Sequence, residues 1–345
     1  MKSAILVKQK SPLVVDDVEI PPSLDYGQVL VKVHYSGICG AQINEIDGVK
    51  GPDKFLPHLL GHEGGGVVEI IGSGVTKVKP GDHVVLHWRK GNGIQSPTPI
   101  YKWGNKSVNA GWVTTFNEYA VVSENRITPI SKKIDLKIAS LYGCAITTGF
   151  GVVHNNSHLK SGESIAVFGV GGAGTSIILA ASLTSAYPVI AIDINDFKLR
   201  QAKYFGATHF INSTKENPRK KIEEYVSSEG ADVAVDTTGI NQVRELAYEV
   251  TNKEGRTILV GVPKSGEKMC IDSFPLHFTK KITGSHGGDC NPTYDIPRLL
   301  RLQESGRFNL EKMITKIYPL DKINDAIHEM RTGDIVRCVI KMTNT

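Results

Sequence analysis

The sequence predicts an α/β protein in which a mainly antiparallel β region is followed by a parallel sheet wound with helices. Residues 1 to about 130 are rich in glycine, valine and short alternating runs such as "QVLVKVHYSG" and "GDHVVLHW", which are typical of short strands joined by turns. From about 135, strand-like runs such as "SIAVFGV", "PVIAIDI" and "RTILVGV" alternate with helix-length segments. That alternation indicates βαβ units, and a length of 345 residues favours two domains.

The end of the chain does not continue the parallel alternation. After about residue 286 come two helical segments, "DIPRLLRLQESG" and "DKINDAIHEMRTG", and then a final strand, "IVRCVIKM". We therefore expect the C-terminal segment to pack back on the first domain.

Composition excludes several classes of function. A hydrophobic content of 40% and a charged content of 22% are those of a globular protein. The net charge of +5 predicts no general affinity for nucleic acid or membranes, and the sequence has no run of 18 apolar residues and no signal-peptide layout. Five cysteines, an odd and scattered set, argue against a disulfide framework, so we expect a reducing compartment, the cytoplasm.

A dinucleotide site is predicted where "SIAVFGVGGAGTSIILAA" places a glycine-rich turn between an apolar strand and an apolar helix. The phosphates would lie at the N-terminus of that helix, near Gly172. Asp193 ends the next strand and would hold a ribose diol, and no Arg or Lys follows it at once to hold a 2′-phosphate, which favours NAD over NADP. The alternative is an unrelated glycine turn. The residues predicted to bind the cofactor here are Gly169, Gly171, Gly172, Ala173, Gly174 and Asp193.

A metal site is suggested by Cys39, His62 and Cys144. Three protein ligands with room for one more oxygen have the stoichiometry of a catalytic zinc. Taken singly, each has a plainer interpretation: the cysteines as buried small apolar groups, and the histidine as a hydrogen-bonded core residue. Their spacing in the sequence does not decide between these.

Three motifs together resemble the zinc-containing medium-chain alcohol dehydrogenases, and the resemblance runs almost from end to end. They are GHE-x-x-G at 61–66, "GCAITTGFG" at 143–151 and GxGxxG at 169–174. The resemblance implies a GroES-like, mainly β catalytic domain (1–145 and 286–345) with an inserted Rossmann domain (146–285). It also implies hydride transfer between an alcohol and NAD, a zinc ion that polarises the alcohol oxygen, and a homodimer or homotetramer.

By position, the resemblance implies that Cys39, His62 and Cys144 hold the catalytic zinc and that Glu63, the acid beside them, belongs to the same metal-binding and catalytic set. It places Thr148 and the segment "LVGV", with Val260 and Val262, at the nicotinamide. Lys198 would lie near the adenosine ribose, and Arg337 would reach the pyrophosphate.

The chain departs from the family at two places. It has no cysteine between Asp82 and Glu118, where many members carry four that hold a structural zinc, so we predict one zinc per chain, the catalytic one. It also has Ala41 and Asn44 where the family places steps of a proton relay.

The proton would then travel through Glu63, through His87 if that residue faces the cleft, through water, or through a substrate hydroxyl. Next to Ala41 stands Gln42, where the family usually has an aspartate, and its oxygen would orient the ligand histidine without a negative charge. The alternative from another class of function is a protein that binds NAD and zinc without turnover.

The substrate is predicted from residues 83–117, which contain all three tryptophans and no acidic residue. By resemblance, Trp88 falls at an aromatic wall of the substrate pocket, and Lys102 and Lys106 would attract an anionic group. The hypothesis is a polyol, cyclitol or sugar-like secondary alcohol, and the runner-up is a simple aliphatic or aromatic alcohol. The alternative for the segment itself is a surface loop or subunit contact whose tryptophans fill a small core of their own.

Overall fold

The computed structural model describes residues 1–342, which form two compact units. The first contains Met1–Cys144, Asn291–Thr332 and the chain from Arg337 onwards, and the second contains Ala145–Cys290 and Gly333–Val336. The predicted fold class, a mainly antiparallel β part and a helix-covered parallel sheet, is confirmed.

The first unit contains two sheets. One has the strand order β2 (Val14–Asp17), β1 (Lys2–Leu6), β4 (His58–Leu59), β8 (Lys106–Asn109), β7 (Ile100–Trp103). The other has the order β10 (Ile127–Ile130), β6 (His83–His87), β5 (Glu63–Ile71), β3 (Gln28–Ile38), β18 (Arg337–Lys341), β17 (Ile314–Pro319), with β9 (Tyr119–Ser123) also paired to β3. The helices of this unit are α1 (Gly40–Ile46), α2 (Leu136–Ala139), α8 (Pro292–Glu304) and α9 (Ile323–Thr332).

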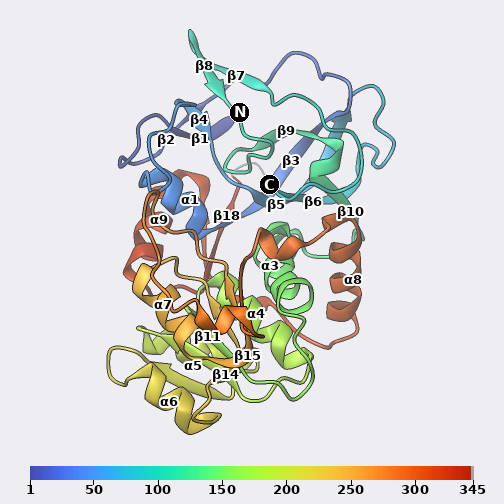
Figure 1. Ribbon diagram of the computed structural model, residues 1–345. Helices are drawn as coiled ribbons and strands as arrows, with labels where there is room; N and C mark the ends of the chain where they lie inside the picture. The colour runs from blue at the N-terminus through green and yellow to red at the C-terminus, as the bar shows by residue number, and fades with distance from the viewer. Residues whose placement is uncertain (343–345) are drawn as a thin grey trace. The chain divides into compact units, whose positions relative to one another are not determined.

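The C-terminal strand returns to the first unit, as the sequence predicts. β18 pairs antiparallel with β3, Cys338 opposite Ile38, and Figure 1 shows the red strand beside the blue one. β17 pairs parallel with β18 and was not foreseen, because its run, "ITKIYP", is short and contains no buried residue. The register of β18 places Arg337 next to the end of β3.

The glycine run at the start of β5 is required by close packing. A Cβ on Gly65 would lie 2.2 Å from the carbonyl oxygen of Leu136, and one on Gly66 would lie 2.4 Å from that of Lys32. Such distances are too short for any side chain, so the run "EGGG" lets α2 and β3 approach the strand that follows His62.

The second unit is built on one parallel sheet with the strand order β13 (His209–Asn212), β12 (Val189–Asp193), β11 (Ile165–Phe168), β14 (Ala231–Asp236), β15 (Thr251–Leu259), β16 (Lys281–Gly284). The order reverses at β11, where open α/β sheets bind ligands at the carboxyl ends of the strands. Its helices are α3 (Ala145–Gly151), α4 (Gly172–Leu183), α5 (Asp196–Ala202), α6 (Pro218–Tyr225) and α7 (Asn241–Glu249).

Apolar side chains of β11, β12, β14 and the helices close the core of this unit, with Phe168, Ile190 and Ile222 at its centre. Among residues 1–342, no single helix is long and apolar enough to cross a membrane. One bent pair of shorter segments, Leu136–Gly143 with Ala145–Asn156, matches by length and composition alone.

Candidate metal and dinucleotide sites

The first unit gathers Cys39, His62 and Cys144, although 105 residues separate the first from the last. One ligand atom from each lies within 4.8 Å of the other two. The Nε2 atom of His62 is buried and has no hydrogen-bond partner. Two thiols and a histidine with an unsatisfied nitrogen form a donor set that suits zinc.

Strand pairing explains why these three side chains meet. β3 and β5 are antiparallel, with Ser36 opposite Gly64, so the end of β3 lies beside the start of β5. Cys39 follows β3 as the N-cap of α1, and His62 precedes β5. Cys144 follows the short helix Ser140–Gly143. A Cβ at Gly143 would lie 2.3 Å from the carbonyl oxygen of Leu86, so only glycine permits this approach.

The charges around Cys39 favour a thiolate. The hydrogen bond with Cys144, together with His62 and the positive charge of Arg337, holds the pKa of Cys39 well below its ordinary value, although burial acts the other way. A thiolate is the form of cysteine that binds a metal. The site is therefore prepared electrostatically for a cation.

Glu63 and Arg337 occupy positions that differ from the expected ones. The carboxylate of Glu63 is not a member of the ligand group, and it forms an ion pair with Arg337. The two side chains are 0% and 3% exposed. Arg337, expected at the pyrophosphate, is thus directed to Glu63 and Cys39, because the pairing of β18 with β3 brings it to the end of that strand.

Gln42 also makes a contact other than the expected one. Its Oε1 accepts a hydrogen bond from the Gly61 amide at 2.5 Å, and its Nε2 donates to Glu45 at 3.2 Å. The side chain therefore fixes the backbone just before His62 and not the imidazole ring. Glu45 also lies 3.9 Å from Nε2 of His58, and that nitrogen is 2.7 Å from an oxygen of Asp53.

His87 does not match the predicted role of a proton carrier. Its ring is 0% exposed, with Nδ1 at 2.7 Å from the carbonyl oxygen of Arg89 and Nε2 at 3.0 Å from the hydroxyl of Thr128. Burial lowers its pKa to about 3. A histidine that is neutral and engaged at both nitrogens serves as a structural hydrogen-bonding group.

Most of the segment predicted to bind substrate packs elsewhere. Tyr101 is buried in the core of the sheet that contains β7, and Trp103 packs against the same core. Lys102 is exposed, and the ammonium of Lys106 lies 5.4 Å from the centre of the Trp103 ring. The structure does not bring the two lysines to the metal cluster. Tyr101 and Trp103 pack with Ile5, Leu59 and Val121, so these aromatic residues belong to the core of the first unit and do not form a small core of their own.

Trp88 is the exception, because its ring centre lies 6.4 Å from that of His62. The register of β5 and β6 pairs Glu63 with His87, so the residues on either side, His62 and Trp88, become neighbours. The guanidinium carbon of Arg89 lies 5.8 Å from the Trp88 ring centre. An aromatic and a cationic side chain thus stand beside the candidate metal site.

In the second unit, the glycine motif forms the turn between β11 and α4. Gly169 has φ +86°, and a Cβ on Gly174 would lie 1.9 Å from the carbonyl oxygen of Gly169. At Gly171, the N-cap of α4, a Cβ would meet nothing within 4 Å, and Gly172 and Ala173 begin the helix. These are the three roles that glycines have in a dinucleotide turn: the bend, the open approach for phosphate, and close packing.

Asp193 lies at the carboxyl end of β12, next to this turn. Its Oδ2 accepts a hydrogen bond from the Val170 amide at 2.7 Å, and its Oδ1 accepts one from Asn195 at 3.0 Å. The carboxylate is thereby fixed beside the glycines. Of the other residues expected at the cofactor, Thr148 is buried in α3, Lys198 is half-buried in α5, and Val260 and Val262 follow β15.

The sequence did not indicate two buried charged residues that the structure places near the candidate sites. Asp236 ends β14 with a buried carboxylate that accepts hydrogen bonds from the amides of Thr238 and Gly239. Arg126 is buried next to Trp88. The position of Asp236 at the end of a buried parallel strand was a signal available in the sequence, whereas nothing in the pattern marks Arg126.

Comparison with known proteins identifies the family of the chain. Residues 25–132 match the family model described as the alcohol dehydrogenase GroES-like domain, and residues 169–305 match the one described as zinc-binding dehydrogenase. The chain belongs to the zinc-containing medium-chain alcohol dehydrogenases. It is therefore a member of an oxidoreductase family whose activity is expected to depend on zinc and NAD.

Relatives of several kinds within this family cover the whole chain. Alcohol dehydrogenase 6 of Peromyscus maniculatus is 32% identical, over 98% of this chain and 97% of its own length. A probable S-(hydroxymethyl)glutathione dehydrogenase of Schizosaccharomyces pombe is 31% identical, over 99% and 97%. The crystal structure of benzyl alcohol dehydrogenase from Acinetobacter calcoaceticus superposes with a TM-score of 0.89 at 29% identity, over 99% of both chains.

Proposed function

We propose that this chain is a zinc- and NAD-dependent alcohol dehydrogenase with one catalytic zinc per chain and no structural zinc. Its catalytic domain would comprise residues 1–145 and 286–345, and its NAD-binding domain residues 146–285. The observation that carries the proposal is the gathering of Cys39, His62 and Cys144 around a buried, unsatisfied histidine nitrogen. Family membership supports the reaction class.

In this proposal, zinc supplies a Lewis acid for the alcohol oxygen and NAD accepts the hydride. The chain's own residues bind and orient. Trp88 bounds the space beside His62, the amides at the start of α4 receive the pyrophosphate, and Asp193 accepts hydrogen bonds from a ribose diol. The residues further proposed at the cofactor are Thr148, Lys198, Val260 and Val262.

The proton released by the alcohol has no side-chain carrier among the candidates. Ala41 and Asn44 do not titrate, His87 is engaged at both nitrogens, and Glu63 is held by Arg337. We infer that the proton leaves through water or through a second hydroxyl of the substrate. The pH dependence of turnover would then reflect the alcohol itself and not a histidine of this chain.

The side chains at Trp88 support two classes of substrate. The ring of Trp88 next to His62 favours an alcohol with an apolar or aromatic group. The cation of Arg89 over that ring favours the polyol, cyclitol or sugar-like secondary alcohol, including an anionic one. Lys102 and Lys106 lie on the hairpin of β7 and β8. A preference for an anionic substrate would therefore depend on Arg89.

A panel of alcohols tests the proposal. NAD reduction is followed with benzylic alcohols, short aliphatic alcohols, polyols and sugar phosphates, for the unmodified chain and for Cys39→Ala and Cys144→Ala. Cys270→Ala is the matched control, because Cys270 is exposed and lies outside the ligand group. We expect activity on at least one class, its loss in the two ligand variants, and no change in the control.

Each pattern of activity has a definite meaning. Turnover restricted to benzylic and aliphatic alcohols would select the apolar class, and turnover restricted to polyols or sugar derivatives would select the polar one. Tight NADH binding with no turnover of any alcohol would contradict the enzyme proposal in favour of a binding protein without turnover.

We also propose a homo-oligomer, a dimer or tetramer, formed through the β16 edge of the parallel sheet. β16 ends the strand order, and beside it Phe274 and Phe278 are 68% and 69% exposed with ring centres 5.3 Å apart. An unpaired edge with exposed aromatic residues favours pairing with a second copy. Light scattering of Phe278→Ser at several concentrations tests this. If the dimer forms through this edge, the variant should dissociate more readily than the unmodified chain.

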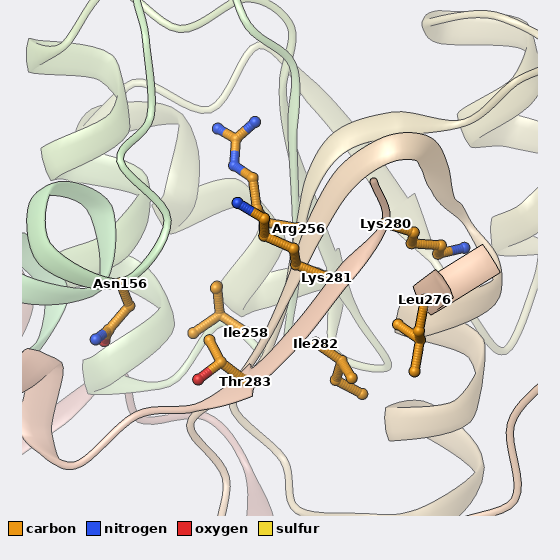
Figure 2. Close-up of a pocket in the computed structure, with 8 residues that line it drawn as sticks. All are labelled: Asn156, Arg256, Ile258, Leu276, Lys280, Lys281, Ile282 and Thr283. Atoms are coloured by element: carbon orange, nitrogen blue, oxygen red, sulfur yellow. The ribbon is translucent and has the colours of Figure 1, made fainter. Parts of the chain in front are cut away.

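A pocket of about 370 Å³ lies along the same edge. Three cationic residues line it, and Figure 2 shows the head groups of Arg256 and Lys281 on one side and that of Lys280 on the other. Arg256 binds Glu163, and Lys280 donates to the carbonyl oxygen of Thr251. Two of the three cations therefore already have acceptors within the chain. Five free thiols further support the proposed cytoplasmic location.

A further inference from the structure

We propose that Arg126 is a positioning residue that fixes Trp88 beside His62 and thereby sets which alcohols the site accepts. The inference rests on the proposed function, because it assumes that the alcohol binds at the cluster of Cys39, His62 and Cys144. It assigns to Arg126 a role that the sequence did not indicate.

The geometry begins with the end of a strand ladder. β6 pairs with β10, and the last pair is Leu86 with Ile127. Trp88 lies beyond that pair. The guanidinium of Arg126, the residue just before β10, donates a hydrogen bond from Nη1 to this carbonyl oxygen. The side chain thus continues the ladder by one step and holds the backbone that carries the Trp88 ring.

Two further contacts fix the guanidinium itself. Its Nη2 donates to the Oε1 atom of Gln95 at 3.0 Å, and its carbon lies 4.4 Å from the ring centre of Trp112. Arg126 is 2% exposed, whereas Trp112 is 59% exposed and covers it from the solvent side. A planar group that is held at two nitrogens and on one face cannot rotate. The guanidinium therefore keeps the Trp88 carbonyl oxygen, and the backbone around it, in one position.

The neighbouring acid does not neutralise this arginine. Glu124 lies in the same short helix, Glu124–Arg126, and its carboxylate accepts hydrogen bonds from the amides of Thr76, Lys77 and Ile94. Burial, and the nearby charge of Arg89, lower the pKa of Arg126 to about 10. Keeping a buried cation without an ion-pair partner is unfavourable for stability. A positional role at Trp88 explains why an arginine, and not an apolar residue, fills this place.

The test compares three variants at one turn. Arg126→Met keeps an unbranched apolar stem but removes the guanidinium and both of its hydrogen bonds. Arg126→Lys keeps the charge on a single donor nitrogen, and cannot bond to Trp88 and Gln95 as a planar fork. Glu124→Gln is the matched control, because it loosens the same turn without touching Trp88.

Steady-state kinetics give the first readout. For a benzylic alcohol, which would contact the Trp88 ring, we expect kcat/KM to fall about 10- to 100-fold in Arg126→Met, because misplacement of a positioning group by about 1 Å has effects of that order. For ethanol, which is too small to depend on contact with the Trp88 ring, we expect a fall in kcat/KM of less than about threefold. Arg126→Lys should lie between, and Glu124→Gln should change both alcohols alike.

Fluorescence gives a second readout that needs no activity. In a chain with Trp103→Phe and Trp112→Phe, Trp88 is the only tryptophan. Arg126→Met in that chain should shift its emission to longer wavelength and lower its anisotropy, whereas Glu124→Gln should do neither. Far-UV circular dichroism and zinc content confirm that each variant is folded, and Arg126→Lys serves if Arg126→Met is not.

The outcomes separate the inference from the proposed function. Unchanged Trp88 fluorescence in Arg126→Met and Arg126→Lys would overturn the positioning role, whatever the activity. An equal fall for benzylic alcohol and ethanol would do so too, since it would show a merely structural effect. If the unmodified chain oxidised no alcohol while the fluorescence changed as expected, Arg126 would still position Trp88, and the proposed function would be the part that failed.

Discussion

The buried ion pair of Glu63 and Arg337 makes a quantitative prediction for Glu63→Gln. The substitution keeps the shape of the side chain and removes its charge, and both side chains of the pair are at most 3% exposed. Removing one partner of a buried pair costs about 3–5 kcal/mol, because an uncompensated charge remains in the interior. Cys39 lies beside Arg337 and its thiolate offsets part of this loss, so we expect a value near the lower end, about 3 kcal/mol.

Urea unfolding followed by circular dichroism measures this free energy, and thermal unfolding gives a parallel value. For domains of 150–250 residues, 1 kcal/mol corresponds to about 2–4 °C in Tm, so the expected fall in Tm is about 6–12 °C. Glu223→Gln is the matched control, because the Arg219–Glu223 pair is exposed. That pair should contribute less than about 0.5 kcal/mol.

A double variant checks the cause. In Glu63→Gln with Arg337→Met, no charge of the pair remains buried, so the loss should be smaller than in Glu63→Gln alone. A loss below about 1 kcal/mol in Glu63→Gln would refute the reasoning. So would a double variant whose loss equals the sum of the two single losses, because the charges would then act independently.

Three further predictions follow from buried polar groups. His87 has a pKa of about 3 when the chain is folded and about 6.5 when it is unfolded. The unfolded chain therefore binds the proton first as the pH falls, and the free energy of unfolding should fall by about 1.4 kcal/mol per pH unit below pH 6.5. His87→Asn should remove that slope in urea unfolding at several pH values. Tyr101→Phe removes the acceptor of the Val121 amide at 2.9 Å and should cost about 1–3 kcal/mol in the same assay. Burial raises the pKa of Glu163, but the hydrogen bonds from Arg256 and from the Lys160 amide, together with the charge of Arg256, lower it on balance. Its contribution is therefore present at neutral pH and lost as the pH falls below about 4.5, and Glu163→Gln should remove about 1–3 kcal/mol at pH 7 and very little at pH 3.

The sequence predicted those features that follow from short motifs. The turn with Gly169 and Gly174, and Asp193 at the end of the next strand, are local signals whose geometry is set by one βαβ unit. The gathering of Cys39, His62 and Cys144 could not be derived from spacing, because it depends on the pairing of β3 with β5. The resemblance to a family supplied that set, and the structure brings the three side chains together.

Features that depend on strand register were missed. Arg337 lies at Glu63 because Cys338 pairs with Ile38, and no local pattern encodes that register. Another miss was avoidable. In "IYKWGNKSVN", alternating residues flank a Gly-Asn pair, which is a hairpin signal. That alternation directs Tyr101 inward, to the core of the first unit, and Lys102 outward.

The central claim is that Cys39, His62 and Cys144 form the zinc site of this chain. The most direct measurement is the zinc content of the purified native protein by elemental mass spectrometry, with Cys39→Ala, Cys144→Ala and the control Cys270→Ala. We predict about one zinc per chain in the native protein and the control, and loss of that zinc in both ligand variants. No zinc in native protein that still binds NADH, or zinc that stays in both ligand variants, would contradict the account.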